Sequence, residues 1–501
     1  MTVEETQVVA EVVIPQEDPK KVVEESKEDV QEDCKVKEVE DDDGSKPKTV
    51  QKSSSYKEES NFLSDLKEFE KKALNELKSK LEEAILGNNL FKKDEPKKKE
   101  KEKSVNKEET EKEQEAKEGE GSEKQVQEES EKNEECEEEK KPEVAVEENG
   151  EGIDKDISIW GIPLLPSKGA EGTDVVLLKF LRAREFKVND AFEMLKKTLQ
   201  WRKESNIDSI LDEDLGVDLS SAFYMNGIDR EGHPVCYNIY GVFGNEELYN
   251  KAFGTEENRK QFLRWRFQLM EKGIRKLDLK PGGVTSLLQI SDLKNSPSPS
   301  KKDLRLAMKQ AVGLLQDNYP ELVARNIFIN APFWYYALNA LLSPFLTQRS
   351  KSKFVVARPA KVTETLLKYI PAEEIPVQYG GLKRENDFEF STEDGGASEL
   401  VIKAGSTETI EIPAAEVGAT LIWDLSVLGW EVNYKEEFVP SEDGSYTIII
   451  SKEKKMSSAE GAIRNTFRTN ELGKVLLIIE NSSNKKKRIM YRYKTKKSAF
   501  F

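Results

Sequence analysis

The spacing of hydrophobic and polar positions divides the chain into regions of different character. Up to residue 150 apolar residues are sparse. Between 174 and 203 they recur every three or four residues, which predicts helices. Beyond this point short apolar runs alternate with helical patterns, an order typical of an α/β domain. The apolar runs lie at 235–240, 286–290, 326–330 and 354–357, and the helical patterns at 256–277, 301–316 and 333–346.

The last hundred residues have a different pattern. Apolar or alternating runs are short and close together, and glycines fall between or beside them. Closely spaced strands with turn residues between them are typical of a β-sandwich. We therefore expect an all-β domain over 388–496. Its expected strands lie at 400–403, 407–412, 420–427, 430–434, 447–451, 474–480 and 487–493.

Residues 1–150 contain 47 acidic residues, 28 lysines and no arginine. Such a segment cannot bury enough apolar surface to offset chain entropy, so we expect a disordered acidic tail. One stretch, 61–91, departs from this pattern because Phe62, Leu66, Phe69 and later apolar residues follow a helical period. It is either a helix that binds a membrane surface or a partner, or an isolated, conditionally formed helix without a defined role.

The net charge is distributed unevenly. The first 150 residues carry −19 and the whole chain −17, which leaves +2 for residues 151–501. The acidity of the tail therefore does not exclude anionic partners for the rest. Cys34, Cys136 and Cys236 are widely spaced, and we find neither a secretory leader nor a run of about 18 apolar residues. We expect a cytosolic protein whose membrane contact is peripheral.

Patterns typical of enzymes are missing from the sequence. His233 is the one histidine, and no serine or cysteine nucleophile motif accompanies it, which favours a structural or surface role. No phosphate-binding glycine motif and no zinc-ligand spacing occurs. The acidic tail and the lack of a recognition motif argue against nucleic acid. We therefore expect no enzymatic activity, no metal site and no nucleic-acid binding.

Three motifs carry a resemblance to a known family. They are Leu178-Lys-Phe-Leu-Arg-Ala-Arg, Gln316-Asp-Asn-Tyr-Pro-Glu-Leu and Ile375-Pro-Val-Gln-Tyr-Gly-Gly. These resemble the CRAL-TRIO lipid-binding proteins, whose type member is the yeast phosphatidylinositol transfer protein. The resemblance implies a helical N-terminal part over 155–215 and a lipid-binding domain over 216–384. It also implies a bound phospholipid and no other cofactor.

The C-terminal region carries a second resemblance. Trp423-Asp-Leu, Gly429-Trp, Glu437-Phe-Val-Pro and Gly444-Ser-Tyr-Thr are similar to the GOLD domain. An acidic tail, a CRAL-TRIO unit and a GOLD unit in this order resemble the patellins, plant proteins of membrane traffic. That resemblance implies phosphoinositide binding and a role at the cell plate during division.

The CRAL-TRIO resemblance also points to residues for the lipid headgroup. Arg184, Glu321 and Lys353 stand where the family binds the inositol ring and its phosphate. Arginine and lysine donate charge-assisted hydrogen bonds to phosphate, and Glu321 can orient Lys353 or accept from sugar hydroxyls. The alternative is a structural ion pair between Arg184 and Glu321. Glu185 stands where the type member has a basic residue, so either its side chain turns away from the phosphate or the headgroup preference differs from that of the type member.

A segment without charged residues follows Pro332. In the resembled family it forms a gate helix that opens at the membrane, and Arg349, Lys351 and Lys353 beside it can meet anionic headgroups. A buried core helix would have the same composition. The residues expected to contact the membrane are Phe333, Trp334, Tyr335, Tyr336 and Phe345.

The last predicted strand is rich in basic residues, and no acidic residue follows Glu480. Strand alternation places tyrosines on one face and cations on the other. These cations either form a solvated strand face or provide an electrostatic contact with an anionic membrane. The basic patch consists of Lys485, Lys486, Lys487, Arg488, Arg492 and Lys494.

From these patterns we expect a multidomain lipid carrier or sensor in vesicle and membrane traffic. It would bind phosphoinositides and other anionic phospholipids, and its GOLD unit would contact membrane or trafficking proteins. The alternative is an adaptor that binds proteins through the GOLD unit and the tail, with a vestigial lipid pocket.

Overall fold

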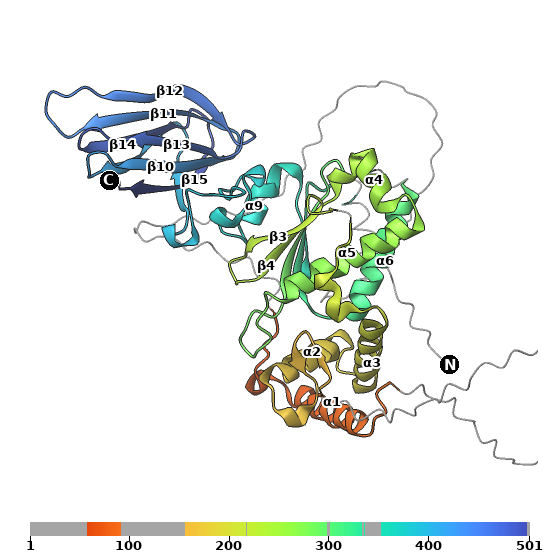
Figure 1. Cartoon of the computed structure of the whole chain (residues 1–501). Coiled ribbons are helices and arrows are strands. Elements are labelled where there is room, and N and C mark those ends of the chain that lie inside the picture. The colour runs from red at the N-terminus through yellow and green to blue at the C-terminus, as the bar shows by residue number, and fades with distance from the viewer. Residues whose placement is uncertain are drawn as a thin grey trace, which may run out of the picture.

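The computed structural model describes residues 58–91, 156–216, 218–297, 301–332, 335 and 352–497. These residues form a helical lobe, an α/β domain and a β-sandwich, with the lobe and the sandwich at opposite ends of the α/β domain (Figure 1). The prediction of an α/β unit followed by an all-β unit is confirmed. The predicted disorder of the tail lies outside the described residues, apart from one helix.

The helical lobe consists mainly of α1 (Glu68–Leu86), α2 (Glu171–Ala183) and α3 (Val188–Glu204). A small hairpin of β1 (Ser158–Ile159) and β2 (Ile162–Pro163) precedes α2. The lobe is held together by one apolar cluster, to which all three helices contribute. Helix α1, although it comes from the acidic region, packs against both α2 and α3.

This packing corrects the expectation of an isolated or membrane-binding helix at 61–91. Leu77 and Leu81 are fully buried, because the apolar stripe of α1 covers the faces that α2 and α3 would otherwise expose. Lys78 Nζ also pairs with Asp174 Oδ1 of α2 at 2.8 Å. The amphipathic pattern was read correctly, but the partner of the helix lies far along the chain, beyond residue 155.

A five-stranded sheet forms the centre of the α/β domain. In spatial order its strands are β3 (Phe223–Ile228), β4 (Pro234–Ile239), β5 (Leu287–Asp292), β6 (Val323–Ile329) and β7 (Phe354–Val356). Strands β3 and β4 are antiparallel, and the pairs from β4 to β7 are parallel. The four strands predicted for this domain correspond to β4 to β7.

Strand β3 was missed in the sequence because it lacks a regular alternation. It contains Gly227, which has a positive φ of 78°, and the pairing register with β4 shifts between Met225 and Ile228. A glycine in the left-handed region is typical of such a bulge.

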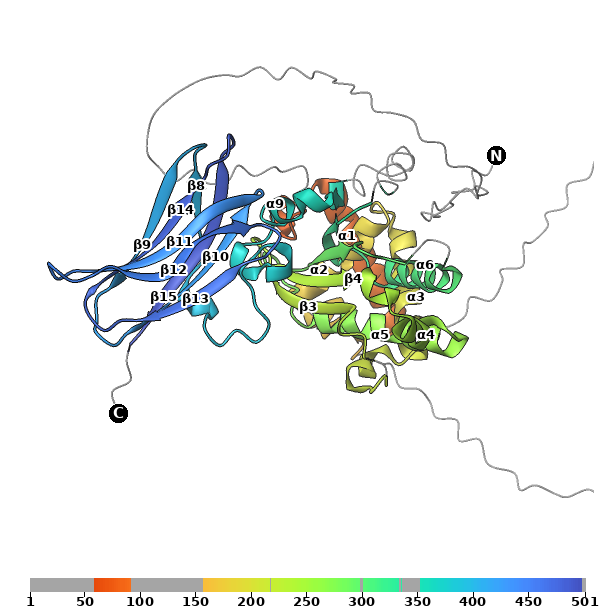
Figure 2. The same cartoon turned by 90° about the horizontal axis from the view of Figure 1, so that it is seen from above.

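Helices cover both faces of the sheet (Figure 2). One face packs against α9 (Val362–Leu366) and the turns that follow it, and the other lies under α4 (Glu246–Phe253), α5 (Glu256–Ile274) and α6 (Lys302–Asn318). The predicted helices at 256–277 and 301–316 correspond to α5 and α6. The pattern at 333–346 lies outside the described residues except for Tyr335.

The β-sandwich has two four-stranded antiparallel sheets. Trp423, Tyr434 and Phe438 are fully buried between them. The structure has one strand more than the seven predicted, because β13 is a polar edge strand with no clear apolar alternation. The first sheet contains β13 (Ile463–Arg468), β10 (Thr420–Leu428), β15 (Lys487–Lys496) and β8 (Ser398–Ile402), and the second β12 (Ile448–Ser457), β11 (Glu431–Pro440), β14 (Gly473–Glu480) and β9 (Thr407–Ala414).

The sandwich packs directly against the α/β domain. Leu428 and Met490 join the apolar cluster around α9. Ser426 Oγ donates to the Gly380 carbonyl at 2.9 Å, and Arg492 Nη2 donates to the Leu382 carbonyl at 2.9 Å. The turn at Gly380 thus links the two units.

Candidate functional site

A partly buried ion pair lies at the amino ends of β6 and β7. Lys353 Nζ is 2.6 Å from Glu321 Oε2, and each side chain is 17% exposed. Lys353 directly precedes β7, and Glu321 stands two residues before β6. Glu321 has a φ of 54°, an uncommon conformation for a residue with a side chain. The chain therefore turns sharply after Pro320 at the point where Glu321 meets Lys353.

A second lysine, which the sequence analysis did not select, completes this site. Lys179 of α2 donates from Nζ to the Glu321 carbonyl at 2.8 Å and to Thr285 Oγ1 at 3.4 Å. Burial lowers its pKa to about 8, although Glu58 and Glu321 favour the charged form. The signal in the sequence was a charge inside the apolar run that begins at Val175. A buried lysine with a lowered pKa, beside a second lysine, is typical of a site that receives an anion.

Arg184, the third predicted headgroup residue, is not joined to the other two. It caps the C-terminus of α2, and its Nη1 donates to the Ala183 carbonyl at 3.4 Å. Arg184 and Glu321 form no ion pair, so the alternative of a structural salt bridge between these two residues is wrong. Glu185 beside it is exposed and has a φ of 51°.

The residues that precede α1 lie across this site; we call residues 58–66 the N-terminal strap. Arg182 of α2 holds the strap by three contacts: Nε is 2.8 Å from Glu59 Oε2, Nη2 donates to the Ser60 carbonyl at 2.6 Å, and Nη1 donates to Asn61 Oδ1 at 2.6 Å. Asn61 Nδ2 in turn donates to Thr285 Oγ1 at 3.5 Å. The strap and Lys179 therefore share Thr285.

The strap also holds the one histidine. His233 Nδ1 is 2.8 Å from Asp229 Oδ2, and its Nε2 is 3.0 Å from Glu58 Oε2. Burial disfavours the imidazolium, but the hydrogen bonds to Asp229 and Glu58 outweigh it and raise the pKa of His233 to about 10. Burial would raise the pKa of Glu58, yet hydrogen bonds from His233 and Ser286 lower it to about 2. His233 thus has a structural role, as the sequence analysis favoured.

Of the predicted gate residues, Tyr335 alone is described. Its ring lies 5.1 Å from that of Phe328 on β6, and Phe328 also contacts Phe354 on β7 at 5.9 Å. The other four, Phe333, Trp334, Tyr336 and Phe345, lie outside the described residues, so the gate stays a prediction.

Three of the six cations of the predicted basic patch are neutralised by carboxylates, which corrects the expectation of a continuous free cationic face. Arg492 pairs with Asp387 at 3.0 Å and with Asp424 at 2.8 Å. The other contacts are those of Lys494 with Asp394 at 3.0 Å, Arg488 with Glu399 at 2.5 Å and Lys487 with the Gly429 carbonyl at 2.5 Å. Within the described sandwich, Lys485 and Lys486 have no such partner.

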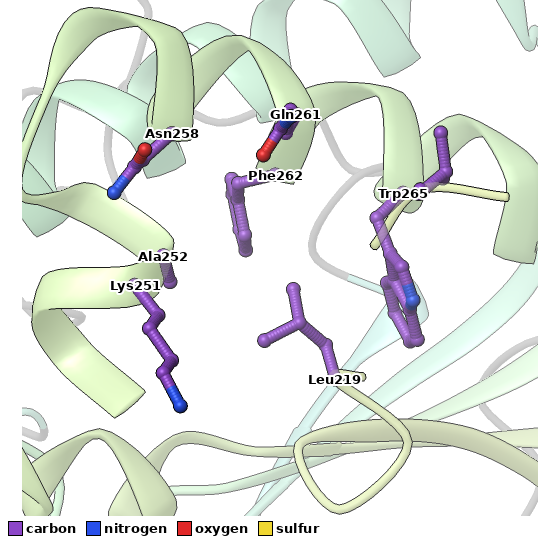
Figure 3. A pocket seen from close by; sticks show the side chains of 8 residues that line it. Leu219, Lys251, Ala252, Asn258, Gln261, Phe262 and Trp265 are labelled. Carbon is purple, nitrogen blue, oxygen red and sulfur yellow. The ribbon is translucent and has the colours of Figure 1, made fainter. Parts of the chain in front are cut away.

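A recess between α4 and α5 offers no comparable chemistry. Leu219, Phe262 and Trp265 line it, with Lys251 at its edge (Figure 3). The space is too small for a water molecule. In the described part of the chain, no three His, Cys, Asp or Glu side chains are placed to hold a metal ion, and no helix is long and apolar enough to cross a membrane.

Family models match each folded unit. Residues 73–197 match the CRAL/TRIO N-terminal domain, residues 219–381 the CRAL/TRIO domain, and residues 403–487 the Patellin-1-like C-terminal GOLD domain. The first match begins within α1, in agreement with the packing of that helix in the lobe.

Two plant proteins resemble the chain along most of its length, and a yeast protein resembles about half of it. Patellin-4 of Arabidopsis thaliana is 57% identical over 99% of this chain and 97% of its own. Patellin-3 of the same plant is 45% identical over 94% of this chain and 83% of its own. Phosphatidylinositol transfer protein SFH5 of Kluyveromyces lactis is 28% identical over 48% of this chain and 80% of its own. Because the identity to Patellin-4 extends over nearly the whole chain, this protein belongs to the patellin family.

Proposed function

We propose that this protein binds a phosphoinositide or another anionic phospholipid and carries or presents it at membranes. It would act from the cytosol as a peripheral membrane protein in vesicle traffic, including at the cell plate. The similarity to a phosphatidylinositol transfer protein supports this proposal, as do the CRAL/TRIO matches. Its chemistry is binding rather than catalysis.

The observation that carries the proposal is the pair Lys353–Glu321 with Lys179 beside it. Two lysines can donate charge-assisted hydrogen bonds to one phosphate, and the partial burial of the site strengthens them. Glu321 accepts from Lys353, and it can instead accept from inositol hydroxyls when a phosphate binds Lys353. The site would therefore recognise a headgroup that has both a phosphate and hydroxyls.

The test is lipid binding by the full chain with Lys353→Ala. We expect about tenfold weaker binding to phosphatidylinositol-containing vesicles, because one charge-assisted hydrogen bond is worth about 1.5 to 3 kcal/mol. Lys361→Ala is the matched control, since Lys361 is 65% exposed and pairs with Glu364 close by in the chain. Equal binding by both folded variants would remove Lys353 from the site.

A second candidate function is that of an adaptor that binds trafficking proteins through the GOLD unit. Exposed aromatic side chains on loops of the sandwich favour it: Trp430 is 82% and Tyr446 90% exposed. Aromatic side chains are enriched at protein interfaces. Mass spectrometry of lipids extracted from the purified protein separates the two functions, because a stoichiometric phospholipid supports the carrier and an empty protein the adaptor.

A further inference from the structure

One arginine is buried in the α/β domain without a carboxylate. Arg266 of α5 is 7% exposed, and its Nη1 donates to Asn238 Oδ1 at 2.9 Å. Its guanidinium lies 4.2 Å from the ring centre of Phe223, while its Nε has no hydrogen-bond partner. No ion pair with Arg266 occurs within the described ranges. The segment that joins β6 to β7, residues 330–353, contains no acidic residue that could supply one.

The other two arginines that are buried in the described part of the chain are paired, which sets Arg266 apart. Arg202 is 3% exposed and lies 2.6 Å from both Glu271 and Asp208. Arg182 is 8% exposed and lies 2.8 Å from Glu59. A cation removed from water without a counter-charge destabilises the fold, and a single aromatic contact compensates only partly. Arg266 is therefore placed to receive a negative charge from outside the protein.

Polar side chains of three strands lie on the same face of the sheet as Arg266. In the strand register Asn238 lies opposite Ser291, and Gln289 lies opposite Asn326. Because side chains alternate between the two faces of a sheet, all four are on the same face. Ser291 Oγ donates to Asn326 Oδ1 at 3.2 Å, so the amide nitrogen of Asn326 remains without a partner among the described residues. The side-chain amide of Gln289 also makes no hydrogen bond there. The face thus combines a cation with two amide nitrogens, those of Asn326 and Gln289, that make no hydrogen bond within the described residues.

The opposite face of the same strands is apolar. There Val235, Ile290 and Ile327 are fully buried against α9 and its neighbours. On the face under α5 and α6, by contrast, Gln289 and Asn326 keep partial solvent access, although β5 and β6 are inner strands. Water or a ligand can therefore reach the polar side chains.

We propose that Arg266, with the amides of Asn326 and Gln289, binds the anionic oxygens of a lipid, either a phosphate or a carboxylate. A guanidinium presents several donors in one plane, which matches both groups, and the amides add neutral donors. Arg266 contacts Asn238 near the carboxyl end of β4, and Gln289 and Asn326 lie in the middle of β5 and β6, whereas Lys353 and Glu321 precede β7 and β6. The new site is thus a second polar subsite, and it rests on the proposed lipid binding.

The test is the selectivity of lipid loading by the full chain. The protein is incubated with phosphatidylcholine vesicles that contain phosphatidic acid, oleate or phosphatidylinositol, and bound lipids are measured by mass spectrometry. Arg266→Gln keeps a donor for Asn238 but removes the charge. We expect the ratio of bound phosphatidic acid or oleate to bound phosphatidylcholine to fall about tenfold. The lipid that responds identifies phosphate or carboxylate as the recognised group.

Arg275→Gln, at the exposed end of the same helix, is the matched control and should leave the ratio unchanged. Asn326→Leu keeps Arg266 and should lower the ratio by a smaller factor, which provides a test if Arg266→Gln does not fold. An unchanged ratio in a folded Arg266→Gln or Asn326→Leu variant would overturn the proposal. Lys353→Ala should lower the binding of phosphatidylinositol only. If Lys353→Ala has no effect while Arg266→Gln lowers the ratio, the headgroup site at Lys353 is wrong and the site at Arg266 stands.

Discussion

Basic residues gather under the N-terminal strap and along β15, and their counter-charges come from different parts of the molecule. On β15 the partners Asp387 and Asp424 are integral to the packing between the sandwich and the α/β domain. Under the strap, Arg182 and His233 are paired with Glu59 and Glu58, which belong to a short segment before α1. Similar residue types are thus paired within the domain packing in one place and by the short N-terminal strap in the other.

The largest effect should come from breaking the charge network of the sandwich. Asp424 is fully buried and contacts Arg464 at 2.7 Å and Arg492 at 2.8 Å. Asp424→Ala should lower the free energy of unfolding by about 3 to 5 kcal/mol, because Arg464 and Arg492 would then share Asp387 and Arg384 would lose its contact with Asp424 at 3.7 Å. Urea unfolding measures this, with Lys485→Ala as a control that should change stability by less than about 0.5 kcal/mol. A small effect of Asp424→Ala would mean that β15 is held by apolar packing alone.

The contacts of His233 with the strap should make the free energy of unfolding depend on pH. The pKa of His233 is raised on folding, so its contribution to stability is complete below about 6.5 and is lost as the pH rises toward about 10. The difference in unfolding free energy between the wild type and His233→Gln should therefore shrink over this range, by on the order of a few kcal/mol. Chemical denaturation at several pH values provides the measurement. A constant difference would show that the imidazolium does not hold the strap.

Vesicle binding should distinguish paired from unpaired cations of the sandwich. Lys485→Ala with Lys486→Ala should weaken binding to anionic vesicles by roughly 2 kcal/mol, because each basic residue near the surface contributes about 1 kcal/mol. Arg488→Gln is the matched control, and it should have little effect because Glu399 already neutralises that arginine. If the arginine variant weakens binding as much, the whole predicted patch faces the membrane. Sedimentation with vesicles at low salt is the assay.

The smallest effect should come from the segment before the strap. Residues 1–57 contain 16 acidic residues and nine lysines, and their removal leaves α1 and the strap intact. We expect vesicle binding to rise by a factor of about two to three at low salt and to return to the wild-type value at high salt, since the Debye length shrinks to about 3 Å at 1 M. Weaker binding after the deletion, at both salt concentrations, would identify these residues as an anchor. Truncation at residue 150 is not a suitable test of the charge effect, because it also removes α1 from the core of the helical lobe.

The sequence was sufficient for the fold class and for part of the site. The change of period near residue 390 predicted the sandwich, and the motifs around Glu321 and Lys353 placed two residues that the structure brings into contact. The neutralisation of Arg492 and Lys494 was beyond sequence analysis, because their partners Asp387 and Asp394 lie about a hundred positions earlier. Arg266 was missed for a similar reason, since the spacing of hydrophobic and polar residues does not show which buried cation lacks a counter-charge.

The position of α1 has a consequence for how the chain is connected. The segment 92–155 joins two elements of the same lobe, so it is an insertion within a domain rather than part of a tail. A protease that cuts within this segment would separate α1 from the rest of the polypeptide but not from its partners, since Leu77 and Leu81 stay buried against α2 and α3. The two fragments should co-purify under native conditions and part only in denaturant, as a protein assembled from two chains would.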